Sequence, residues 1–210
     1  MLQYYIIKLV KNYPALNKFL SETEKKLSDF FGINIEKPSI FFLNSRKDID
    51  KILGKKTEDW FSAWVKNGNI YILNHKIYTK ESNHNIKHFW QTIKHEYCHL
   101  YFQQLTGTNY PKWLNEGLAC YFAEQAKKIP TQGTLMKIFD YFQKSDWQIY
   151  SVAYFWVNFL IEKFGRQKIL NLLKSMNFQI TEEQFAKNFY KIYQFHYSRK
   201  DFDKILKKFI

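Results

Sequence analysis

A chain of 210 residues with 46% hydrophobic side chains is long enough to bury one core, or two small subdomains that share one, which excludes a disordered tail. The net charge of +13 comes from lysines spread along the whole length, without a basic stripe that alternates with aromatics, so we expect a solvated lysine surface and no nucleic-acid partner. Two cysteines are too few for a disulfide framework, and no apolar stretch is long enough to span a membrane. No signal peptide is recognised. We therefore expect a cytoplasmic protein, and secretion of a processed form stays open.

The first third of the chain predicts a small α+β unit. The expected elements are a helix over 14–31, a strand over 39–43, a short helix over 46–53 and two strands within 62–73. Pro14 and Gly32 are typical of the start and stop of a helix. The Asn67-Gly68 dipeptide is a strong hairpin signal.

Strand signals fade after Ile86, and the rest of the chain predicts helices. The expected helices cover 86–106, 111–128, 134–145, 151–176 with a break at Gly165, and 181–208 with a break near Tyr197. Thr181 and Gln184 fit a capping box. We therefore expect an α+β fold with one domain over 1–210, in which subdomain 1–107 is α+β and subdomain 108–210 is helical.

The string HEYCH places His95 and His99 four residues apart within a predicted helix. Side chains at this spacing share a helix face, so both imidazoles can bind one metal ion. Glu96 lies about 100° around the helix axis from His95, where it does not easily join the same ligand set but can reach a water at the metal. Its predicted role is general base.

Glu116 is the candidate third ligand. Gly107 suits the position after a helix end and Pro111 suits the first turn of the next helix, so two antiparallel helices are expected here. His99 and Glu116 would then lie at similar depths from the turn, and the small Gly117 would let these helices approach closely. Two imidazoles and one carboxylate leave a position for water, as in catalytic zinc sites.

Other candidate residues support no second site. His84 and His88 also lie four apart, but no carboxylate is placed to complete a metal site. Cys98 and Cys120 are expected to be small core residues. Asn115 and Glu124 are the candidates for hydrogen-bonding the metal-bound histidines, and the sequence does not choose between them.

The strings HEYCH and WLNEGLA together resemble the gluzincin branch of zinc metallopeptidases, in particular its compact peptidase-MA-like domains, over residues 88–124. The resemblance implies a zincin-like fold with one zinc ion. The two histidines and the second glutamate of the family bind zinc, which carries over to His95, His99 and Glu116. The first glutamate is the base, which carries over to Glu96.

A weaker resemblance extends to "IYSVAYFWVNFLIEKFG", which is similar to a family helix whose tyrosine hydrogen-bonds the oxyanion. Tyr150 falls at that position, but Ala153 replaces a frequent serine and Tyr154 lies one turn away, so the choice of tyrosine stays open. The family also commonly binds an extended peptide along a sheet edge, which residues 67–73 could offer, or these residues could form an ordinary hairpin.

The function expected from these residues is zinc-dependent hydrolysis of peptide bonds, with Glu96 as general base for a metal-activated water and a peptide or protein as substrate. The alternative is a catalytically silent zinc-containing module that binds a protein or peptide, although it would not need an intact Glu96. A third hypothesis is a basic binder of nucleic acid or membrane surface with a structural metal. The choice between endo- and exopeptidase and the oligomeric state stay open.

Overall fold

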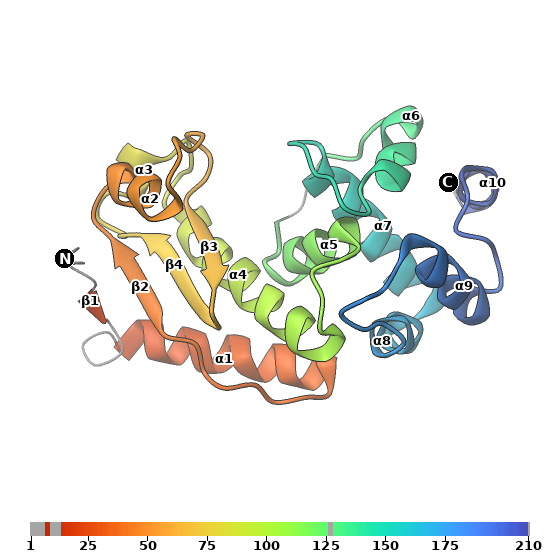
Figure 1. The fold of residues 1–210 in the computed structure, drawn as a ribbon, viewed down its shortest axis with the longest axis horizontal. Coiled ribbons are helices and arrows are strands. Elements are labelled where there is room, and N and C mark those ends of the chain that lie inside the picture. The colour runs from red at the N-terminus through yellow and green to blue at the C-terminus, as the bar shows by residue number, and fades with distance from the viewer. Residues whose placement is uncertain (1–6, 9–13, 126–127, 210) are drawn as a thin grey trace. The chain divides into compact units, whose positions relative to one another are not determined.

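The computed structural model describes residues 7–8, 14–125 and 128–209 of the chain (Figure 1). The protein is α+β and mostly helical, as predicted. It divides into two compact units, Met1–Leu100 and Tyr101–Ile210, and the division falls within the long helix α4 (Lys87–Thr106). We predicted a boundary at residue 107, where this helix ends. That the two units act as a single zincin-like domain stays a prediction.

The first unit contains a four-stranded sheet. Its strands are β1 (Ile7–Lys8), β2 (Ile40–Leu43), β3 (Ala63–Lys66) and β4 (Asn69–Leu73). Their spatial order is β1-β2-β4-β3, with β2 and β4 parallel and the other pairs antiparallel. The hairpin at Asn67 and Gly68 is confirmed, and both residues have positive φ angles, 50° and 71°, as a type I′ turn requires.

The structure decides between the two alternatives for residues 67–73, a free sheet edge or an ordinary hairpin. These residues complete a hairpin, and β4 is not a free edge because it lies between β2 and β3 with a partner on both sides. Among the described strands, β3 is the edge on this side of the sheet. The strand β4 is internal because β2 pairs with it in parallel. This pairing joins residues about 30 positions apart, and no local signal in the hairpin specifies it.

In the described part of the first unit, the helices before α4 are α1 (Pro14–Phe31), α2 (Arg46–Leu53) and α3 (Tyr78–Glu81). The first two match the prediction, whereas α3 and β1 were not predicted. Phe42 of β2 stacks on Phe89 of α4 at 6.0 Å, which places α4 against the sheet. Phe19 of α1 contacts Trp90 of α4 at 4.8 Å, so the two long helices also pack together. The helix with the HExxH motif is thus fixed from two directions.

The second unit is helical. After the end of α4 it contains α5 (Lys112–Phe122), α6 (Gln132–Leu135), the 3₁₀ helix η2 (Met136–Asp140), α7 (Ile149–Phe164), α8 (Arg166–Lys174), α9 (Glu182–Tyr193) and α10 (Arg199–Phe209). The predicted breaks at Gly165 and around Tyr197 and the capping box at Thr181 are confirmed. Its core is aromatic: Trp156, Phe189 and Phe202 are fully buried, and the rings of Trp156 and Phe202 are 4.5 Å apart.

Two predicted helices end earlier than expected. The helix predicted over 111–128 ends at Phe122, because Glu124 adopts a left-handed conformation with φ 55°. The helix predicted over 134–145 is replaced by α6 and η2, which end at Asp140. The carbonyls of the next two residues, 141 and 142, accept hydrogen bonds from the first two N–H groups of α5, at 3.1 and 2.8 Å. These carbonyls cap another helix and therefore do not continue their own.

Candidate metal centre

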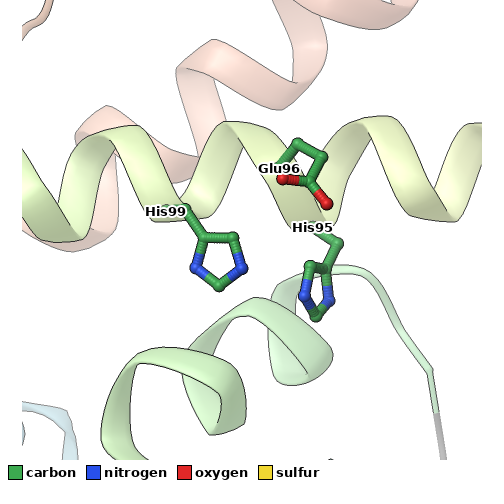
Figure 2. A group of neighbouring side chains, drawn as sticks. All are labelled: His95, Glu96 and His99. Carbon is green, nitrogen blue, oxygen red and sulfur yellow. The ribbon is translucent and has the colours of Figure 1, made fainter. Parts of the chain in front are cut away.

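The HExxH motif lies in the middle of α4, and helix geometry alone brings its two histidines together. His95 and His99 leave one face of the helix because they are four residues apart. Their ring centroids are 4.7 Å apart and the rings are nearly perpendicular, at 86°. Figure 2 shows both rings on the same side of α4. This is the arrangement that the sequence predicts.

Three donor groups meet at this point. Ring nitrogens of His95 and His99 and a carboxylate oxygen of Glu96 all lie within 4.8 Å of one another, as in a group that could hold a metal ion. Zinc binds imidazole nitrogen and carboxylate oxygen at about 2.0–2.2 Å. The group formed by these three side chains could therefore hold a metal ion.

Burial distinguishes these residues from ordinary surface histidines and glutamates. His95 and Glu96 are each 8% exposed, and His99 is half-buried. A buried carboxylate is costly unless a cation or hydrogen bonds compensate it, so such a position is unusual for a glutamate without a structural or chemical role. In Figure 2 the Glu96 side chain lies above both rings. Its carboxylate nevertheless belongs to the same donor group, so the role of base rather than ligand stays a prediction.

Tyr78, a buried tyrosine with no signal in the local sequence, lies near Glu96. The hydroxyl of Tyr78 is 2.8 Å from the Thr92 hydroxyl and accepts a hydrogen bond of 3.3 Å from Ser62. Burial raises the pKa of Tyr78, these two hydrogen bonds oppose the increase, and the Glu96 charge adds to it. Tyr78 is therefore protonated at neutral pH. A buried tyrosine needs a polar partner, but the sequence does not show which one it meets.

Glu116, the predicted third ligand, lies on α5 in the second unit and is half-buried. His95 and His99 belong to the first unit, so completion of the donor set by Glu116 stays a prediction. The small residue beside it makes a different contact from the one expected. A Cβ atom on Gly117 would lie 2.5 Å from the carbonyl oxygen of Ala153, so α5 crosses α7 closely at this point.

The same crossing bears on the predicted oxyanion tyrosines. Tyr150 lies in the first turn of α7 and Tyr154 directly follows Ala153, and both are half-buried. Since Ala153 contacts Gly117, the α7 segment with both tyrosines lies against the α5 turn that carries Glu116. Their roles stay predictions.

The remaining candidates are placed as follows. His84 and His88 have ring centroids 5.6 Å apart, but Nε2 of His84 is 2.8 Å from the carbonyl oxygen of Trp60. Within residues 7–8, 14–125 and 128–209, the group of side chains that could hold a metal ion is the one on α4. Cys98 and Cys120 are fully buried and form no disulfide, as expected of core residues. Asn115 is buried, whereas Glu124 is exposed beyond the end of α5.

Within the part of the chain that the structure describes, no helix is long and apolar enough to cross a membrane. No family model, curated protein or solved structure matches the chain. The case for a function therefore rests on the residues of the site.

Proposed function

We propose that the protein is a zinc peptidase that hydrolyses peptide bonds. The observation that supports this proposal is the gathering of two imidazoles and one buried carboxylate within 4.8 Å on a single helix. The donor set suits zinc, and the third residue suits proton transfer. The resemblance of the HEYCH and WLNEGLA strings to gluzincins supports the same function and a zincin-like fold.

The proposed roles follow from side-chain chemistry. His95 and His99 hold the ion through neutral ring nitrogens, and Glu116 is proposed as the third ligand. Zinc, when bound, supplies a Lewis acid that polarises the substrate carbonyl and lowers the pKa of water to about 7. A carboxylate oxygen of Glu96 takes a proton from the attacking water and then donates it to the leaving amine. The hydroxyl of Tyr150 or Tyr154 is proposed to donate a hydrogen bond to the oxyanion.

The edge strand β3 is the proposed docking site for the substrate backbone. Backbone N–H and C=O groups on a sheet edge can pair with an extended peptide, which adds a strand to the sheet. Val65 and Lys66 lie at this edge, and β3 belongs to the same unit as His95 and His99. This strand replaces the segment 67–73, whose strand β4 lies inside the sheet.

The test compares metal content and peptide cleavage in wild type, Glu96→Gln and Glu162→Gln. Glu162 is an exposed glutamate of α7 and serves as the matched control. We expect about one zinc per chain in all three proteins and cleavage of a mixed quenched-peptide library by wild type and Glu162→Gln. Loss of a general base should reduce kcat by about 10²–10⁴-fold in Glu96→Gln.

Each other result has a definite meaning. Zinc in all three proteins without cleavage by any would contradict the peptidase proposal and favour the silent peptide-binding module. Absence of zinc would contradict the metal site itself. Equal cleavage by wild type and Glu96→Gln would show that Glu96 is not the base.

A further inference from the structure

A chain of three hydroxyl groups links the edge strand β3 to helix α4. Ser62 immediately precedes β3, Tyr78 is the first residue of α3, and Thr92 lies on α4. Ser62 Oγ donates to Tyr78 Oη at 3.3 Å, and Tyr78 Oη lies 2.8 Å from Thr92 Oγ1. Ser62 is 4% exposed and Tyr78 is fully buried. Loss of a buried partner leaves a polar group unsatisfied, so this chain fixes the spacing of the elements that it joins.

Ser62 and Thr92, the two ends of this series of hydroxyl groups, lie at positions that matter for the proposed reaction. Thr92 lies four residues before Glu96 on α4, so the two side chains leave the same helix face one turn apart. Ser62 is held in the sheet by its own backbone, because its carbonyl accepts from the N–H of Leu73 at 2.9 Å. The hydroxyl groups therefore connect the residue just before the edge strand β3 to the α4 turn before the proposed base.

The ring of Tyr78 is held separately from its hydroxyl. It meets Phe89 of α4 edge-on at 5.3 Å and stacks on His84 at 6.0 Å. Because these ring contacts do not involve the oxygen, Tyr78→Phe removes the hydroxyl link and leaves the packing in place. The substitution is thus a narrow probe of the link.

We propose that Tyr78 is a positioning residue, whose hydroxyl holds the edge strand β3 at a fixed distance from the α4 turn that precedes Glu96. An extended peptide paired with β3 is then held with its scissile carbonyl in register with the base, whereas a short substrate that makes no strand pairing does not need this link. The catalytic consequence rests on the proposed peptidase function; the mechanical link between β3 and α4 does not.

The kinetic test uses an extended peptide and a short dipeptide-type substrate with Tyr78→Phe, Thr92→Val and Thr92→Ser. We expect kcat/KM for the extended peptide to fall about fivefold to tenfold in the first two variants, the scale of one lost hydrogen bond. The short substrate should change less than about twofold, and Thr92→Ser, which keeps a hydroxyl, should behave as wild type. Equal losses on both substrates, or no loss on either, would overturn the positioning role.

Amide hydrogen exchange tests the link without activity or metal. Tyr78→Phe should exchange faster than wild type at the β3 amides that pair with β4, while the amides of α1 stay unchanged. Tyr71→Phe is the matched control, because Tyr71 lies in the same sheet outside the hydroxyl chain. If wild type cleaves neither substrate, the peptidase proposal fails and exchange alone decides this inference. Unchanged exchange at β3 would refute it.

Discussion

Gly117→Ala should destabilise the protein by separating α5 from α7. The added Cβ would lie 2.5 Å from both the carbonyl oxygen of Ala153 and Cγ2 of Val157. Ordinary contacts begin near 3.4 Å, so the two helices must move apart by about 1 Å. The Ala153 oxygen belongs to the backbone of α7 and cannot rotate away, which makes this contact more costly than a clash with a flexible side chain.

The magnitude is the difference between two opposing effects. Overpacking of a well-packed interior costs about 1–3 kcal/mol and occasionally more, and the backbone contact at Gly117 puts this case at the upper end. Replacement of glycine by alanine inside a helix stabilises by about 1 kcal/mol. We expect a net loss of about 2 kcal/mol in the free energy of unfolding, which lowers Tm by about 4–8 °C for a chain of this size.

The assay is chemical and thermal unfolding of Gly117→Ala beside Gly133→Ala. Gly133 lies in α6 with open space around its Cβ position, so the control gains helix propensity without a clash. Gly133→Ala should be unchanged or up to about 1 kcal/mol more stable than wild type. Equal stability of the two variants would refute the close crossing of α5 and α7, and with it the placement of Tyr150 and Tyr154 against the α5 turn that carries Glu116.

Three further predictions concern the first unit and the metal. Arg46 donates hydrogen bonds to the carbonyls of 58, 59, 61 and 81, so Arg46→Lys should cost about 2 kcal/mol in urea unfolding, and no change would contradict this role. Hydrogen bonds from the side chain and backbone of Thr57 lower the pKa of Asp50, so the stability they provide is present above the unfolded pKa and disappears as pH falls through the folded pKa. Thr57→Val should raise the Asp50 pKa in an NMR titration, and its loss of unfolding free energy relative to wild type should be smaller in acid than at neutral pH. An unchanged Asp50 pKa would show that Thr57 does not lower it. Zinc at about 100 times its Kd should raise the free energy of unfolding of wild type and of Glu96→Gln by about 2.7 kcal/mol. A chelator should reverse this stabilisation, and His99→Ala should not show it.

Local chemistry made several elements predictable from sequence. Helix α1 has the predicted bounds because Pro14 favours a first turn and Gly32 adopts the positive φ, 68°, that ends a helix. The hairpin forms at Asn67 and Gly68 because these residues tolerate left-handed backbone. The interactions that decide such features lie within a few residues along the chain.

Features decided by contacts between distant residues were missed or misplaced. The helix predicted over 134–145 ends at Asp140, since the carbonyls that follow cap α5. Gly117 was assigned to the contact between the HExxH helix and α5, but it packs against α7. Whether residues 67–73 offer a sheet edge stayed open, because strand order depends on which strands pair across the fold.

The sequence by itself determined the pairing of His95 with His99, because the period of the α-helix sets their common face whatever the rest of the chain does. It also indicated the position of Glu96 beside them. Only the tertiary structure decided what surrounds these residues: the burial of Glu96, and the hydroxyl chain through Tyr78 that joins α4 to β3. Burial and hydrogen bonding between segments are properties of packing, and no local pattern of residues encodes them.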